Sequence, residues 1–221
     1  MDKMNTTLGK DTNVENKLND LFGLSDGVYS NKAVVSLHTI YISGEIEGAE
    51  EYSSIFETIR NAPATDVIKI HINSHGGDLF TAVQFMRVMA ESEATIVASV
   101  EGACMSAATL IFLAAERFEI SEHSVFMFHN YSTMMYGKGG ELYDNIMHDR
   151  QWSENLLRRT YQGFLTEAEI ASILDNKDIW MGHEEAGKRL EKYVSYREKQ
   201  NSEQNQPVTK PKKPRKALDN P

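Results

Sequence analysis

An α/β fold built mainly from parallel strands is the architecture that this 221-residue sequence predicts. Runs rich in β-branched residues alternate along the chain with segments in which apolar residues recur at helical spacing. Glycine or polar turn residues separate the two kinds of segment. Because parallel strands are joined by helical crossovers, this alternation is typical of a sheet covered by helices. The length suits one such domain and is too short for two large ones.

Four segments have the composition of strands. The clearest is Val67–Asn73, where β-branched residues come in near-alternation before the sequence Ser-His-Gly-Gly ends the run. Thr39–Gly44 leads into a glycine turn, and Thr95–Val100 is followed by a break at Gly102. The fourth strand is expected at His123–His129.

Five helices are expected from the spacing of apolar residues. Met105–Ala115 is almost wholly apolar, which indicates a buried helix, whereas Gly140–Phe164 carries a long amphipathic pattern. The sequence Thr-Glu-Ala-Glu at the start of Thr166–Leu174 is a capping box for a short helix. The remaining two helices are expected at Glu51–Ala62 and Thr81–Ala90.

Composition divides the chain into three parts. Residues 1–32 are rich in Asn, Asp, Lys and Gly, which predicts a flexible N-terminal arm. Residues 33–194 hold the strands and helices and form the predicted domain. Residues 195–221 turn to Lys, Gln, Asn and Pro and end in KPKKPRKALDNP. Because that composition cannot bury a core, we expect a disordered basic tail.

Charge, cysteine content and hydropathy limit the classes of function. The formal net charge of −9 argues against a nucleic-acid-binding surface, because phosphate contacts need clustered Lys and Arg. The single cysteine, Cys104, excludes an intramolecular disulfide and fits a reducing compartment. The longest apolar run, Leu110–Ala115, falls far short of the roughly 20 residues of a membrane span, and residues 1–21 lack the apolar core of a secretory signal. We expect a soluble, cytoplasmic protein that binds neither nucleic acid nor a membrane.

Ser106 stands at the start of the buried helix, after a strand and the turn at Gly102. The free backbone N–H groups and the positive dipole end at a helix start are the donors that an oxyanion needs. Small neighbours, among them Ala107, would let a substrate backbone approach closely. Serine is also a favoured N-cap, so an ordinary capping role is the alternative.

The pair Gly76–Gly77 directly follows the strand Val67–Asn73. Two glycines permit positive φ and close backbone approach, so this turn could present an N–H group to a carbonyl oxygen. A plain strand-ending turn would have the same sequence, which leaves both interpretations open.

A histidine and an aspartate later in the chain are candidates for a base and its orienting group. His129 ends the fourth strand, where a base can face a site while the strand stays buried. Asp178 precedes the apolar run Ile179–Met181 and could orient an imidazole. Asp175 is close enough along the chain to be the alternative.

Four segments carry a resemblance to a known family. They are Ile72–Gly77 (INSHGG), Gly102–Ala108 (GACMSAA), Met127–Asn130 (MFHN) and Asp178–Ala186 (DIWMGHEEA). In this order the proteolytic subunit of the Clp protease has INSPGG, GxAASMGA, MIHQP and DRFLSAPEA. The sequence therefore resembles that family over residues 40–194.

The resemblance implies a serine endopeptidase with the ClpP and crotonase-like fold of repeated β-β-α units and a protruding helical handle. Ser106 would be the nucleophile, His129 the general base and Asp178 the residue that orients the base. The backbone N–H groups of Gly77 and Ala107 would form the oxyanion hole.

The resemblance also implies how substrate is handled. Gly76, Gly139 and Gly140 are the expected contacts to a polypeptide substrate, and neither a metal nor a cofactor is implied. The family implies a homo-oligomer of heptameric rings that enclose the active sites, with an AAA+ unfoldase as the partner. Departures such as His75, which replaces the family's proline, would suit a bacteriophage-encoded or otherwise specialised member in a bacterial cytoplasm.

Two other functions remain open. A crotonase-like acyl-CoA enzyme would share the backbone oxyanion hole, but the Ser, His and Asp set speaks against it. A catalytically silent ring subunit or capsid-associated protein is the second, although silent members usually lose a triad residue and none is missing here. A zinc site at His71 and His75 is weaker, because the two straddle a strand and a turn without an evident third ligand.

Overall fold

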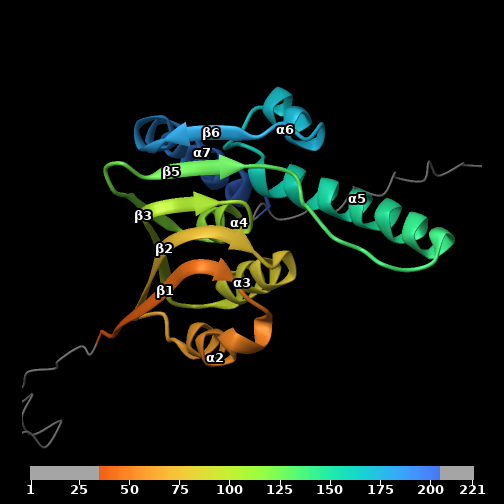
Figure 1. Ribbon diagram of the computed structural model, residues 1–221. Coiled ribbons are helices and arrows are strands. Elements are labelled where there is room, and N and C mark those ends of the chain that lie inside the picture. The colour runs from red at the N-terminus through yellow and green to blue at the C-terminus, as the bar shows by residue number, and fades with distance from the viewer. Residues whose placement is uncertain (1–34, 205–221) are drawn as a thin grey trace, which may run out of the picture. The chain divides into compact units, whose positions relative to one another are not determined.

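The computed structural model describes residues 35–204, in which helices pack against a six-stranded sheet and one long helix projects from it (Figure 1). The sheet has the order β1-β2-β3-β5-β6, and β4 also pairs with β3. Only β6 among these strands runs antiparallel to its neighbour. The predicted α/β fold with mainly parallel strands is thus confirmed. The strands are β1 (Leu37–Ile46), β2 (Val67–Gly77), β3 (Thr95–Met105), β4 (Arg117–Ile120), β5 (Val125–Phe128) and β6 (Ile179–Gly182).

All five predicted helices are present, and the long C-terminal helix is a further one that was not predicted. The order of the helices is 3-10 helix η1 (Ala49–Tyr52), α2 (Ser53–Asn61), α3 (Leu79–Glu91), α4 (Ala107–Ala114), α5 (Gly139–Tyr161), α6 (Glu167–Leu174) and α7 (His183–Gln204). As its composition predicted, α4 is the buried helix, with seven of its eight residues inside the core. Within residues 35–204, no helix combines the length and apolarity that crossing a membrane requires.

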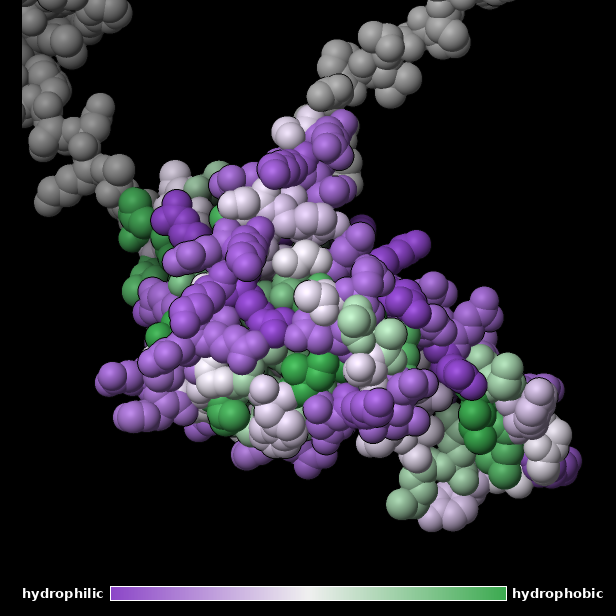
Figure 2. Space-filling view, turned by 90° about the horizontal axis from the view of Figure 1, so that it is seen from above, coloured by the Kyte–Doolittle hydropathy of each residue, from purple (hydrophilic) through white to green (hydrophobic). Residues whose placement is uncertain are grey.

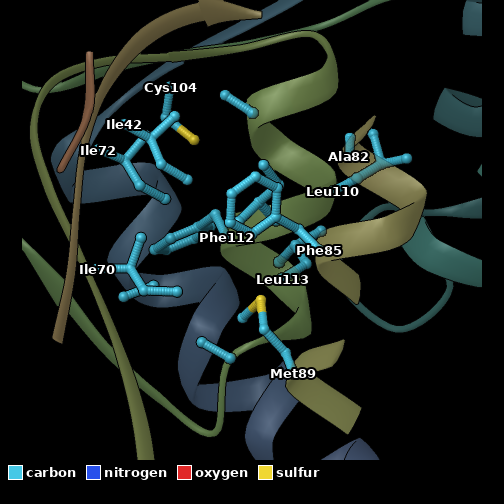
Figure 3. Packing of buried hydrophobic residues seen from close by; sticks show 14 of the residues in the cluster. Ile42, Ile70, Ile72, Ala82, Phe85, Met89, Cys104, Leu110, Phe112 and Leu113 are labelled. Carbon is cyan, nitrogen blue, oxygen red and sulfur yellow. The ribbon is translucent and has the colours of Figure 1, made fainter. Parts of the chain in front are cut away.

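The core lies between the sheet and the helices α3 and α4 (Figure 3). Ile70 and Ile72 of β2 point toward Phe112 of α4, and Phe85 of α3 packs on the other side of α4. Each of these side chains is fully buried. Burying one such side chain contributes about 1.5–3 kcal/mol, so this contact surface holds α4, and with it the residue before α4, firmly against the sheet.

Strands β2 and β3 run further than the sequence predicted. Val67–Gly77 includes the glycine pair because β1 continues beside it, with Ile46 opposite Gly77. β3 continues past Gly102 because β5 pairs with Ala103–Met105. In both strands the hydrogen bonds of a neighbour outweigh the local preference of glycine for turns. The glycine pair and the residues around Ser106 therefore lie at strand ends rather than in loose turns.

The C-terminal part of the domain also differs from the prediction. The short strands β4 and β6 were not predicted, and the expected end of the domain at residue 194 falls inside α7. The helix continues because Tyr193 is buried and Arg197 donates hydrogen bonds to the carbonyl oxygens of Leu113 and Ala115. The predicted arm at 1–32 and residues 205–221 of the predicted tail lie outside the described residues.

Helix α5 projects from the domain (Figure 1). Its C-terminal half packs on the core, where Leu157 and Tyr161 are buried. Its N-terminal half and the loop before it expose large apolar side chains, which appear green on the projecting end in Figure 2. This helix is the protruding segment that the family resemblance implied. The exposed apolar residues there are Met134, Tyr136, Tyr143, Ile146 and Met147.

Candidate active site

Ser106 is the single residue between β3 and α4. Its φ of 53° and ψ of −127° form a conformation that costs a non-glycine residue ~1–3 kcal/mol. Hydrogen bonds hold it: the Ser106 N–H donates to the Met127 carbonyl (2.9 Å), and the Ser106 carbonyl accepts from the N–H (2.9 Å) and hydroxyl (2.7 Å) of Thr109. Although Ser106 occupies the N-cap position, its side chain makes no capping hydrogen bond. Helix capping therefore does not account for this serine.

His129 is the first residue after β5 and is the partner of the Ser106 hydroxyl. A hydrogen bond of 2.6 Å joins His129 Nε2 and Ser106 Oγ. The parallel pairing of β3 and β5, with Met105 opposite Met127, brings the ends of the two strands together. With the imidazole proton on Nδ1, Nε2 accepts this bond from the hydroxyl. A base in such contact with a serine hydroxyl can take its proton and so activate the serine oxygen for attack.

Gly76 packs directly against the turn at Ser106. A Cβ at Gly76 would lie 2.6 Å from the Cβ of Ser106 and 2.8 Å from the carbonyl oxygen of Met105. The φ of Gly76 is +97°, which also favours glycine. Its N–H donates to Ser74 Oγ (3.1 Å), which in turn donates to the Gly44 carbonyl (2.6 Å). The end of β2 is thus held in contact with the serine turn.

Gly77 and Ala107 are the two residues whose backbone N–H groups were predicted to form an oxyanion hole. Gly77 has a φ of +147°, and a Cβ there would overlap the backbone of Ile46 on β1. Ala107 is the first residue of α4, so its N–H belongs to the first turn, where intrahelical acceptors are lacking. Both residues line the same cavity as Ser106.

A cavity of about 360 Å³ opens at Ser106 and His129. The sequence did not single out most of its walls, which come from the loop after His129 and from α3, α4 and α5. In the sequence, only their position directly after His129 could have indicated that Asn130, Tyr131 and Ser132 line the cavity. The other lining residues are Glu45, His75, Gly77, Leu79, Ala107, Leu110, Leu157 and Tyr161.

Two buried groups near the site stay protonated. Burial raises the pKa of the Cys104 thiol, so this residue is not a competing nucleophile. Burial likewise raises the pKa of the Tyr161 hydroxyl, which shares a 2.8 Å hydrogen bond with Thr109 Oγ1. Because Thr109 also binds the Ser106 carbonyl, Tyr161 connects α5 to the serine turn.

Asp178 does not contact the imidazole. It is exposed on the turn before β6, and among residues 35–204 no hydrogen bond joins it to His129. Its backbone is nevertheless close, since β5 and β6 pair with Phe128 opposite Ile179. Continuing this register by one residue sets His129 opposite Asp178, and such positions have Cα atoms about 5 Å apart. The structure therefore brings the backbones of Asp178 and His129 near each other without a hydrogen bond between their side chains.

The alternative carboxylate, Asp175, is the C-cap of α6 and is also exposed. The next residue, Asn176, has a φ of +61°, and its Oδ1 accepts a 3.1 Å hydrogen bond from Asn130 Nδ2. The turn that carries both aspartates is thus joined to the residue after His129.

Of the remaining predicted residues, Gly139, Gly140 and His71 do not line the cavity, whereas His75 does. Gly139 and Gly140 open α5 and are exposed, and neither lines the cavity. His71 Nδ1 bonds Glu101 Oε1 (2.5 Å) on the sheet face, whereas His75 lines the cavity. Within the described part of the chain, no three His, Cys, Asp or Glu side chains are grouped to hold a metal ion.

Comparison with known proteins agrees with this architecture. The family model of the Clp protease matches residues 27–189. Among solved structures, a mutant of ClpP1 from Listeria monocytogenes is similar, with a TM-score of 0.57 and 24% sequence identity over 72% of this chain and 89% of that chain. No curated protein sequence matches the chain. The similarity to the Listeria structure supports a ClpP-like fold, and the matched family supports a serine peptidase of the Clp type. Because the family model spans most of the sequence, this chain belongs to the Clp protease family.

Proposed function

We propose that this protein is a serine endopeptidase that cleaves unfolded polypeptides, with Ser106 as its nucleophile. The observation that carries the proposal is the 2.6 Å hydrogen bond between His129 Nε2 and Ser106 Oγ, made by a serine in a strained backbone conformation. Such strain persists only where the surrounding structure holds it, and it concentrates at active sites.

In the proposed reaction, Ser106 Oγ attacks the scissile carbonyl carbon while His129 Nε2 takes the hydroxyl proton. The N–H groups of Gly77 and Ala107 stabilise the oxyanion. His129 then donates the proton to the leaving amine, and water hydrolyses the acyl-enzyme by the same route. Asp178 rotates onto His129 Nδ1 and holds the tautomer in which Nε2 is the base.

The substrate binds as an extended strand along Gly76 and Gly77, by addition to the end of β2. A folded domain exposes such strands rarely, so it is cut slowly unless an ATP-driven unfoldase acts first. Clp family proteins form oligomeric rings, which supports a homo-oligomer. We propose heptameric rings that enclose the sites, and the exposed apolar residues of α5 are available for such contacts. A strict monomer in light scattering at all concentrations and salts would exclude them.

Reaction with a fluorophosphonate probe tests the nucleophile directly. The probe should label one residue, and peptide mapping should locate the label at Ser106. The Ser106→Ala protein should remain unlabelled. Labelling at another serine, or equal labelling of the variant, would show that Ser106 is not the nucleophile.

A catalytically silent ring subunit is the second candidate, and the exposed position of Asp178 is the observation that favours it. In a silent subunit the imidazole would lack its orienting group, and neither the probe nor a peptide would react. Assembly into rings without labelling would support this function over the peptidase.

A further inference from the structure

A second cavity adjoins the one at Ser106. It encloses about 270 Å³ between the start of α3 and the middle of α5. The two cavities share Gly77, Leu79, Tyr131 and Ser132 as walls. A peptide bound across Ser106 would therefore place a neighbouring side chain in this second cavity.

One wall of the second cavity is aromatic. The rings of Phe80 on α3 and Trp152 on α5 stack with centroids 5.0 Å apart and an interplanar angle of 27°. Phe80 is 68% exposed, so burial in the core does not explain its position. Aromatic faces of this kind bind alkyl chains and attract cations.

The same cavity is negatively charged. Asp149 lies three residues before Trp152, so the two side chains share one face of α5. Asp78 lines the opposite side, where its Oδ1 caps α3 by accepting a hydrogen bond from the Thr81 N–H (2.6 Å). His148 Nδ1 is 3.5 Å from Asp149 Oδ1, but this histidine is 79% exposed and outside the cavity. The lining residues include neither Lys nor Arg.

We propose that this second cavity is a subsite for a Lys or Arg side chain of the polypeptide substrate. The alkyl stem packs on Phe80 and Trp152, and the cationic end reaches the carboxylates of Asp149 and Asp78. The subsite rests on the proposed peptidase function of Ser106 and gives it a substrate preference. A neutral side chain of equal length gains the apolar contact but loses the charge interaction.

Matched peptides test this preference. Fluorogenic peptides carry Lys, norleucine, acetyl-lysine or Glu at one of the positions near the scissile bond, with all other positions constant. At one position, kcat/KM should favour Lys over norleucine about tenfold, the combined size of a cation–π contact and a partly screened ion pair. Equal rates for Lys and norleucine at every position would overturn the subsite.

Two variants locate the preference. Asp149→Asn removes the charge and keeps the shape, so the ratio of kcat/KM for Lys over norleucine should fall toward one. Asp144→Asn changes an exposed carboxylate of the same helix outside the cavity, so the ratio should be unchanged. A ratio that survives Asp149→Asn, or that falls equally in both variants, would contradict the assignment.

A binding measurement separates this inference from the peptidase proposal. Trp152 and Trp180 are the two tryptophans of the chain, so the full-length protein with Ser106→Ala and Trp180→Phe reports the cavity by fluorescence. The Lys peptide should change the Trp152 emission at lower concentration than the norleucine peptide. If Ser106 is not labelled and no peptide is cut, the peptidase proposal fails and this titration still decides the subsite. Identical titrations with both peptides would overturn the subsite alone.

Discussion

Ser106 and His129 are held by the buried ends of parallel strands, whereas Asp178 lies on an exposed turn at the edge of the sheet. The first two residues meet because β3, β5 and α4 share one core, and their hydrogen bond is 2.6 Å long. Asp178 directly precedes Ile179, which pairs with Phe128, but its side chain is exposed and makes no hydrogen bond to His129 within residues 35–204. The fold therefore fixes the proposed nucleophile and base in contact, whereas the proposed orienting residue is not in contact with the base.

Ser106→Ala tests the buried half of the site and should have the largest effect. Peptide hydrolysis should fall by about 10⁴-fold or more, because no other group can form the acyl-enzyme. Circular dichroism and thermal unfolding should change little. The activity is measured by steady-state kinetics of the purified variant. Undiminished activity would show that Ser106 is not the nucleophile.

Gly76→Ala should disturb the position of Ser106 by displacing the backbone that packs against it. The new methyl group would lie 2.6 Å from the Ser106 Cβ at a φ of +97°, so the serine turn must move. A displacement of this kind lowers kcat by about 10²-fold. The control is Gly187→Ala on α7, where a Cβ meets nothing within 4 Å and activity should be retained. Full activity of Gly76→Ala would show that the contact between β2 and the serine turn is dispensable.

Asp178→Asn tests whether the exposed aspartate orients His129 during catalysis. If Asp178 turns onto His129 during catalysis, the amide favours the wrong tautomer, and kcat should fall by orders of magnitude, up to about 10⁴-fold. Asp175→Asn is the matched control and should leave the rate nearly unchanged. The reverse result would assign the orienting role to Asp175, and silence of both would mean that His129 acts without a carboxylate.

The smallest effect is expected at the ion pair that supports the turn carrying these aspartates. Hydrogen bonds from Arg189 lower the pKa of Glu169 from 4.5 to about 2, with further help from the capping box at Thr166. Because the folded pKa is depressed, the stabilisation is fully present above pH 4.5 and is lost as the pH falls from 4.5 toward 2. Glu169→Gln should therefore lower the free energy of unfolding near pH 7 by about 1 kcal/mol, measured by denaturant titration.

As the pH falls to 2, the difference in stability between the wild-type and Glu169→Gln proteins should shrink to a small fraction of its value at pH 7. Glu167→Gln is the control, because the Glu167 side chain is 74% exposed and its ion pair with Arg158 is long, at 3.6 Å. This substitution should change the free energy of unfolding by no more than about 0.5 kcal/mol. A difference for Glu169→Gln that is constant between pH 7 and pH 2 would mean that the charge of Glu169 contributes nothing.

Part of this protein can be predicted from its sequence because local patterns carry the information. β-branched runs and helical spacing located the four long or central strands and most helices, and the apolar segment ahead of Ala115 correctly indicated a buried helix. The same segments revealed Ser106 and His129 as candidates, since Ser106 stands at the start of the predicted buried helix and His129 at the end of a predicted strand.

Other features depend on partners distant in the chain. β4 and β6 are four residues each and exist because β3 and β5 offer them hydrogen bonds. The tail was expected from residue 195, yet α7 continues because Arg197 finds carbonyl oxygens at the end of α4. Short strands and helix ends gain little from local propensity, so long-range contacts decide them.

Composition and periodicity were enough to predict the class of fold and the residue types that serine peptidase chemistry needs. Their geometry comes from the three-dimensional packing: the positive φ of Ser106, its contact with His129, the packing of Gly76 on the serine turn and the exposed side chain of Asp178. The reason is that composition and periodicity act over a few neighbouring residues, whereas these distances are set by strands and helices that meet across the core.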